Sequence, residues 1–207
     1  MAELNLVYRS RLPDAESVPP VVVLVHGWLG NEDAMWVFEQ ALPPGVAIFS
    51  PRAPLKAEGG YGWWMEKDDA DGLRHGLTAL REFITMLPRV HAVDPKRLVL
   101  VGFSQGAAVS AALLLSEPGL LCGVALLAGF LPEAARGWAA PGRLVGKRVF
   151  ITHGLKDEIV PVAEARRARE IFACAGANVT YSEHPVAHKL SPPGLRELRR
   201  WLAATLA

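Results

Sequence analysis

The amino-acid sequence predicts an α/β protein in which a mostly parallel sheet lies between layers of helices, as a three-layer α/β/α sandwich. Short apolar runs of strand length alternate with longer segments of helical period, an order typical of parallel sheets with crossover helices. The strand-like runs, such as residues 21–25, are apolar at nearly every position, which indicates that both faces of the sheet are covered. The 207 residues are 51% hydrophobic and contain no linker, so we expect one domain over residues 1–207.

Seven strands are expected, most of them bounded by proline or by other turn residues. The Pro-rich segment 13–20 separates a short edge strand from the first central strand, and Asp94-Pro95 turns the chain into the fourth. In chain order, the expected strands cover residues 4–10, 21–25, 46–49, 97–101, 121–127, 148–152 and 179–183.

Five helices are expected between these strands, and most have a residue that begins or ends them. Asn31 can cap the first, Pro88 ends the second, and Ser191 can cap the last. Pro161 suits the first turn of the fourth helix, and Gly176 suits the position just after its end. In chain order, the expected helices cover residues 32–41, 73–87, 107–115, 161–175 and 192–206.

One long segment, residues 51–72, shows no convincing period and is rich in glycine and proline. It also carries the aromatic cluster Tyr61, Trp63 and Trp64. A loop of this length inside a compact domain is usually functional, so we expect it to border a site.

The charge balance argues against several classes of partner. The net charge of +1 comes from 22 basic and 21 acidic residues spread along the chain, so nucleic acid is not an expected partner. No apolar run is long enough to cross a bilayer, and residues 1–6 show no basic segment followed by an apolar one. We therefore expect a cytoplasmic protein without stable membrane insertion, and the sequence leaves a homodimer open.

Cys122 and Cys174 are expected to be buried thiols rather than a disulfide or metal ligands.

The segment Gly102-Phe103-Ser104-Gln105-Gly106 is the main candidate for chemistry. It follows the strand at 97–101 and leads directly into the helix at 107–115, so it forms a strand, a sharp turn and a helix. A G-x-S-x-G turn in this setting exposes a serine on a strained backbone, with small neighbours that let strand and helix approach closely. Ser104 is thus the expected nucleophile, although it could also act only as the helix cap.

A serine hydroxyl is a weak nucleophile, so this prediction requires an acid and a base that follow it along the chain. Asp157 is the first choice for the acid, because it lies just beyond a strand end within reach of the next loop. Glu158 is the weaker alternative, since its longer side chain and its position suit the start of a helix.

Four of the six histidines have ordinary explanations. His26 and His153 each begin a His-Gly pair at a strand end, where an imidazole commonly orders the turn by hydrogen bonding. His75 lies on an amphipathic helix and His91 in a polar turn, so both are expected to be structural or solvated.

The expected base is His188, which lies on the loop before the last helix, while His184 is expected to close the last strand. The spacing of the two would also suit a metal pair on a helix. Pro185 lies between them and argues against that helix, so no metal site is expected.

Hydrolysis also needs hydrogen-bond donors for a tetrahedral oxyanion. The first expected donor is the Gln105 N–H, directly after the nucleophile. The second is the Trp28 N–H, because Gly27 lets the loop after residues 21–25 turn its amides inward.

Together these segments resemble the carboxylesterase and acyl-protein thioesterase family of small α/β hydrolases. The resemblance runs from about residue 20 to the C-terminus and includes Pro51-x-Ala53-Pro54, while its main motifs are His26-Gly27, Gly102-Phe103-Ser104-Gln105-Gly106, His153-Gly154-x-x-Asp157-x-x-Val160-Pro161 and Pro185-x-x-His188. It implies an α/β-hydrolase fold, here without an insertion large enough for a separate lid domain. It also implies a Ser104, His188 and Asp157 triad with the Trp28 and Gln105 amides in the oxyanion hole.

The implied activity is hydrolysis of esters or thioesters with apolar acyl or aryl groups, through an acyl-enzyme and without a metal or organic cofactor. An acyltransferase or peptidase on the same triad, or a non-catalytic ligand-binding protein, is the alternative. Besides Trp28, the residues expected to border the pocket are Leu29, Trp63, Trp64, Phe130, Leu131 and Leu155, with core packing as the alternative for each aromatic.

Two positions depart from the family pattern. The family commonly has leucine after His-Gly and a second glycine after G-F-S-Q-G, where this chain has Trp28 and Ala107. Neither change removes a catalytic group, and the bulk of Trp28 is expected to narrow the pocket.

Overall fold

A seven-stranded sheet forms the centre of the molecule. The computed structural model describes the chain outside residues 1–2, 15–16 and 67–68. The strands of this sheet are β1 (Tyr8–Arg11), β2 (Val21–Val25), β3 (Ala47–Pro51), β6 (Leu98–Phe103), β7 (Gly123–Leu127), β8 (Arg148–Gly154) and β9 (Asn178–His184). Their order is β1-β3-β2-β6-β7-β8-β9, and only β1 pairs antiparallel with its neighbour. The predicted mostly parallel sheet is therefore confirmed, and the edge strand expected at 4–10 begins only at Tyr8.

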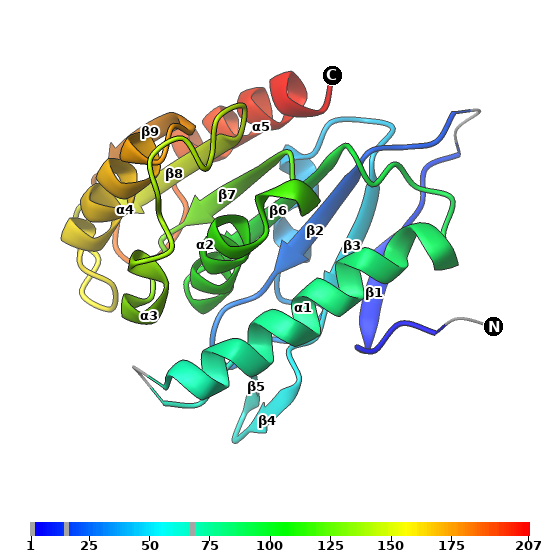
Figure 1. The fold of residues 1–207 in the computed structure, drawn as a ribbon, viewed down its shortest axis with the longest axis horizontal. Helices are drawn as coiled ribbons and strands as arrows, with labels where there is room; N and C mark the ends of the chain where they lie inside the picture. Colours follow the sequence, from blue (N-terminus) through cyan, green and yellow to red (C-terminus); the bar gives the residue numbers. More distant parts are fainter. Residues whose placement is uncertain (1–2, 15–16, 67–68) are drawn as a thin grey trace.

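Helices cover both faces of the sheet (Figure 1). They are the 3₁₀ helices η1 (Trp36–Ala41) and η2 (Pro118–Leu120), and the α-helices α1 (Ala70–Val90), α2 (Gln105–Ser116), α3 (Glu133–Arg136), α4 (Val162–Cys174) and α5 (Pro192–Leu206). Helices α1, α2 and α4 pack on one face, whereas η1 and α5 pack on the other.

Strand β2 shows why its apolar run is continuous. Val21, Val23 and Val25 belong to the core beneath α1, α2 and α4, whereas Val22 and Leu24 belong to the core beneath α5. Successive strand residues point to opposite faces, so a strand covered on both sides needs apolar residues throughout. This arrangement confirms the predicted three-layer sandwich.

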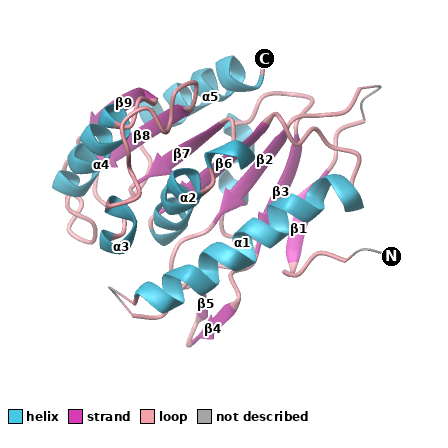
Figure 2. Cartoon of the chain, viewed as in Figure 1, coloured by secondary structure: helices cyan, strands magenta, loops and turns pink. Residues whose placement is uncertain are grey.

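The prediction of a helix over residues 32–41 is wrong. Asn31 does bond the chain that follows it, because its side-chain oxygen accepts from the N–H groups of Asp33 and Ala34 at 3.0 and 3.1 Å. These bonds close a tight turn, and only the short 3₁₀ helix η1 follows. Figure 2 shows the longer helices in cyan beside the magenta strands. A side chain that bonds the local backbone in this way competes with α-helix formation.

The end expected for the second helix is also wrong, because α1 continues through Pro88 to Val90. Proline removes one backbone donor and crowds the preceding turn, which costs most in a helix interior. Pro88 lies in the last turn, where packing of Phe83, Ile84 and Leu87 in the core favours a continued helix. The helix begins at Ala70, where the Asp69 side chain accepts from two backbone N–H groups.

The long segment at 51–72 contains a small hairpin, β4 (Leu55–Ala57) and β5 (Gly60–Gly62). The Tyr61 N–H donates to the Gly30 carbonyl at 3.0 Å, so the hairpin is joined to the loop after β2. Strands of three residues are too short for a sequence period to reveal.

The last two helices follow the sequence signals closely. Gly176 has φ +91°, the left-handed backbone expected after the end of α4, and Ser191 caps α5 by accepting from the Gly194 N–H at 3.0 Å. One related expectation is wrong: Cys174 is exposed and Cys122 is only partly buried. Cys174 lies two residues beyond buried Phe172, and residues two apart do not share a helix face.

Among the described residues, no helix is both long enough and apolar enough to cross a membrane.

Candidate active site

Ser104 lies at a sharp turn between β6 and α2, as the sequence predicts. Its backbone has φ 53° and ψ −117°, and within the described residues its side chain makes no capping hydrogen bond. The flanking glycines are required by close contacts, because a methyl group at Gly106 would lie 2.1 Å from the Val25 carbonyl oxygen. A methyl group at Gly102 would lie 2.4 Å from the Gly106 carbonyl oxygen. The turn thus presents a free hydroxyl at the end of a buried strand.

Backbone strain is concentrated around this turn. In the described part of the chain, the non-glycine residues with positive φ are Leu29, Ser104 and Ala128, which follow β2, β6 and β7. Each such residue costs about 1–3 kcal/mol and persists only where the surrounding structure enforces it. All three lie beyond the carboxyl ends of neighbouring parallel strands, where binding sites of such sheets occur.

The Asp157 carboxylate is buried in the loop after β8. Its Oδ1 accepts from the Ile159 and Val160 N–H groups at 3.0 and 2.9 Å, and its Oδ2 accepts from His188 Nδ1 at 2.7 Å. Burial acts to raise the pKa of Asp157, but the bonds from Val160, His188 and Ile159 outweigh it and hold the pKa below its usual value. Asp157 is therefore an ionised acceptor that orients the His188 ring. The alternative acid, Glu158, is exposed.

His188 lies between this carboxylate and the serine turn. Its ring centroid is 4.9 Å from that of Phe103, the residue before Ser104. With Nδ1–H donated to Asp157, the other ring nitrogen, Nε2, is left to accept a proton. No bond joins Ser104 and His188 among those of the described residues, and such bonds are often long until a substrate is bound.

The other candidate base, His184, ends β9 and has a different partner. Its Nε2 lies 3.2 Å from a carboxylate oxygen of Glu197 on α5. His184 and His188 thus contact separate acids, an arrangement that favours His188 as the partner of Asp157.

His153 lies against the Asp157 carboxylate. From the sequence, its imidazole was expected only to order the turn after the strand. Its Nε2–H donates to the Val160 carbonyl at 2.8 Å and lies 3.2 Å from Asp157 Oδ2, and the ring is fully buried. The ring therefore fixes the loop that carries Asp157. The spacing His153-x-x-x-Asp157 is the signal that could have suggested this contact.

The loop after β2 lies beside Ser104. A methyl group at Gly27 would lie 3.2 Å from Ser104 Cβ and 3.2 Å from the Phe103 carbonyl oxygen. The Trp28 and Gln105 N–H groups have no acceptor among the described residues. The two amides expected to form the oxyanion hole are thus free donors on adjacent turns, and their role stays a prediction.

Comparison with known proteins shows the family of this chain. A family model described as phospholipase/carboxylesterase matches residues 13–206. The chain belongs to the phospholipase/carboxylesterase family. Acyl-protein thioesterase 1 of Debaryomyces hansenii is 27% identical, over 91% of this chain and 92% of its own. The same-named protein of Saccharomyces cerevisiae is 26% identical, over 90% and 92%.

Solved structures show the same fold. A Bacillus cereus carboxylesterase superposes with a TM-score of 0.88 at 24% identity, covering 97% of this chain and 95% of its own. Zea mays acyl-protein thioesterase 2 superposes with a TM-score of 0.74 at 20% identity, covering 97% and 99%. This member of the phospholipase/carboxylesterase family therefore has an α/β-hydrolase fold and is an enzyme of the carboxylesterase and thioesterase type.

The residues expected to line the pocket of this family member divide into two groups. Trp28, Leu29 and Leu155 are 41%, 43% and 48% exposed, so their side chains are available to a substrate. The others are wholly or mostly covered: Trp63 is 0% exposed, Leu131 1% and Trp64 5%, and Phe130 is partly buried against the Trp64 ring. For Trp63, Trp64 and Leu131, the expectation of a pocket wall is corrected to core packing, since tertiary contacts enclose them.

The Gln105 side chain has a role that the sequence did not reveal. Its Oε1 accepts from the Trp63 N–H at 2.9 Å and its Nε2 donates to the Trp64 carbonyl at 2.8 Å, both in the interior. The residue after the proposed nucleophile thereby fastens the loop after β5 to the start of α2. The sequence indicates a role only for its backbone amide, because the partner of the side chain lies about forty residues away in the chain.

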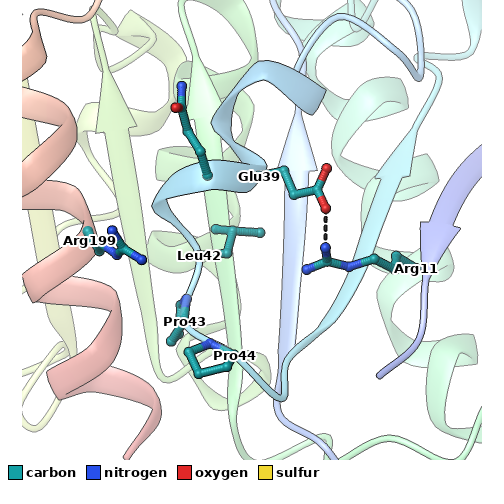
Figure 3. A pocket seen from close by; sticks show the side chains of 7 residues that line it. Arg11, Glu39, Leu42, Pro43, Pro44 and Arg199 are labelled. Carbon is teal, nitrogen blue, oxygen red and sulfur yellow. Dashed lines mark hydrogen bonds and ion pairs between the residues drawn. The ribbon is translucent and has the colours of Figure 1, made fainter. Parts of the chain in front are cut away.

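One surface pocket lies apart from the predicted catalytic residues, and Figure 3 shows the side chains that line it. It has a volume of about 590 Å³ and lies between η1 and α5, lined by Arg11, Glu39, Gln40, Leu42, Pro43, Pro44 and Arg199. An ion pair joins Arg11 and Glu39 at its rim. None of the predicted catalytic residues reaches it.

Gly154 lies closely against the loop that carries His188. A methyl group there would lie 2.3 Å from the carbonyl oxygens of both Val186 and Ala187. We expect Gly154→Ala to shift this loop and lower kcat by about 10²-fold, the cost of displacing a catalytic group by about 1 Å. The control is Gly119→Ala, because a methyl group at Gly119 meets nothing within 4 Å. Steady-state kinetics on a short aryl ester would measure kcat for both variants. An unchanged kcat in Gly154→Ala would show that turnover does not depend on this close approach.

Proposed function

We propose that this chain hydrolyses carboxylic esters or acyl thioesters with apolar acyl or aryl groups, with Ser104 as the nucleophile. The observation that carries the proposal is the 2.7 Å bond between His188 Nδ1 and buried Asp157, beside the strained turn that holds Ser104. This arrangement supports a serine, histidine and aspartate acting as a unit.

In the proposed mechanism, Ser104 Oγ attacks the substrate carbonyl while His188 Nε2 takes its proton. The carbonyl oxygen becomes an oxyanion and receives hydrogen bonds from the Gln105 and Trp28 N–H groups. The intermediate collapses as His188 returns the proton to the departing alcohol or thiol, which leaves an acyl-Ser104 ester. Water then attacks that ester with His188 again as the base, and the carboxylic acid and free Ser104 result.

Asp157 serves this scheme by its charge. Its lowered pKa keeps it anionic, so it holds the His188 tautomer with hydrogen on Nδ1 and stabilises the imidazolium formed in each step. The scheme needs neither a metal nor an organic cofactor.

The exposed rim of the site supports the proposed substrate class. Trp28, Leu29 and Leu155 supply apolar surface at the ends of β2 and β8, suited to an acyl chain or aryl ring. The Trp28 ring packs over Gly62, where a methyl group would lie 2.3 Å from its Cζ3. A small-molecule ester or thioester is thus the proposed partner, and the cytoplasm is the proposed location.

Covalent labelling with a fluorophosphonate tests the proposal. We expect one adduct on the wild-type protein, at Ser104, and labelling at least about 10²-fold slower in His188→Ala because the hydroxyl loses its base. Mass spectrometry of the intact protein and its peptides would measure both. A protein that stays unlabelled at Ser104 would instead fit a non-catalytic ligand binder.

A further inference from the structure

His26 is completely buried at the end of β2, and both ring nitrogens have partners. The Ala53 N–H donates to His26 Nε2 at 2.9 Å, which requires that Nε2 carry no hydrogen. The ring is therefore the neutral tautomer with hydrogen on Nδ1. That Nδ1–H donates to the Gly27 carbonyl oxygen at 2.7 Å.

The Gly27 carbonyl is bonded to the Trp28 nitrogen. A trans peptide is planar, and its C=O and N–H point in opposite directions. A bond that fixes the Gly27 oxygen therefore also fixes the direction of the Trp28 N–H, the second proposed oxyanion donor.

We propose that His26 is a positioning residue that holds the Gly27–Trp28 peptide with its N–H directed at the oxyanion formed on Ser104. The proposal rests on the hydrolytic mechanism proposed above. It assigns to His26 a part in transition-state stabilisation, although the imidazole itself touches no reacting atom.

The surroundings of the ring keep it in this position. A methyl group at Gly30 would lie 2.6 Å from His26 Nδ1, so the loop closes directly over the imidazole, and the Gly30 N–H also donates to the Gly27 oxygen at 3.1 Å. On the other side, the Trp63 indole N–H donates to the His26 carbonyl at 2.9 Å, with the two ring centroids 5.7 Å apart. Burial lowers the pKa of His26, in agreement with a neutral ring at neutral pH.

The same contacts link His26 to Gln105. Gln105 accepts from the Trp63 N–H, and Trp63 in turn bonds the His26 carbonyl. The two segments expected to bind the oxyanion are thus held by one set of buried hydrogen bonds. These bonds would keep the Trp28 and Gln105 N–H groups at a fixed separation and orientation.

Two substitutions at His26 each keep one of the two hydrogen bonds of the imidazole and remove the other. The side-chain nitrogen of asparagine is bonded to Cγ, as is Nδ1, so His26→Asn can still donate to the Gly27 oxygen while it abandons Ala53. The side-chain amide of glutamine lies one bond further out, near Nε2, so His26→Gln can still accept from Ala53 while it abandons Gly27. Each variant loses one buried hydrogen bond, so a purely structural role predicts equal effects.

We expect His26→Gln to lose about 10²-fold in kcat, the cost of one misdirected oxyanion donor, and His26→Asn to lose about tenfold or less. KM should change little in either variant, because the oxyanion forms only after Ser104 attacks and is absent from the bound substrate. Thermal midpoints should fall by similar amounts in both. His75→Gln, on the exposed face of α1, is the matched control and should retain wild-type kinetics.

The inference would be overturned if both variants lost kcat equally and their thermal midpoints fell by the same amount. The proposed function would still stand in that case, provided that the wild-type protein is labelled at Ser104. A wild-type protein that is inactive and unlabelled would overturn both. If the variants do not fold, nitrogen-15 NMR of the wild-type imidazoles decides the question. Hydrogen on His26 Nδ1 supports the inference, and hydrogen on Nε2 refutes it.

Discussion

Replacing Ser104 with alanine should lower kcat/KM for short acyl esters by about 10⁴-fold or more, as losses of a triad serine do. The substitution removes only the hydroxyl, and that oxygen makes no capping bond within the described residues. The fold should thus persist, with an unchanged circular dichroism spectrum and a thermal midpoint close to that of the wild type. Hydrolysis of an aryl ester, followed by absorbance, would measure the loss.

Ser116→Ala provides the matched control for this change. Ser116 lies at the end of α2, where its hydroxyl donates to the Leu113 carbonyl at 3.2 Å. We expect full activity from it. Wild-type turnover by Ser104→Ala would exclude Ser104 as the nucleophile.

The second large effect is expected at Asp157. Asp157→Asn should lower kcat by about 10³- to 10⁴-fold, because a neutral amide can present its NH₂ to His188 and so stabilise the wrong tautomer. It also removes the anion that stabilises the imidazolium. Glu158→Gln changes an exposed residue of the same loop and should leave kcat within about twofold of wild type, as surface changes usually do.

Steady-state kinetics of the two variants therefore discriminate between the two acids. If Asp157→Asn kept wild-type turnover and Glu158→Gln abolished it, the acid would be Glu158. The 2.7 Å bond to His188 would then have no catalytic meaning.

The sequence predicted those parts of the molecule whose causes are local. The turn at Ser104 follows from a continuous apolar strand, two glycines and a buried helix, all within about twenty adjacent residues. The pairing of Asp157 with His188 could also be expected, because both follow neighbouring parallel strands and so meet at one edge of the sheet.

Features that depend on distant partners could not be predicted in this way. Trp28 and Trp63 are both aromatic residues beside glycine in loops, yet Trp28 is 41% exposed and Trp63 is fully buried. What separates them is the contact of Trp63 with Gln105 and His26, which lie far from it in sequence. The contact between His153 and Asp157 was missed for a different reason, since its short spacing is also common in turns without function.

The left-handed backbone at Ser104 lowers the thermal stability of the protein, whereas the proposed reaction needs a serine at this position. Glycine adopts such a backbone at least cost, so among all substitutions at position 104 it would best relieve the local strain. Glycine also removes the hydroxyl. A directed-evolution screen that rewards heat resistance alone would therefore draw this position toward glycine and discard the proposed nucleophile. Engineering this chain for durability calls for selection on turnover in the same round.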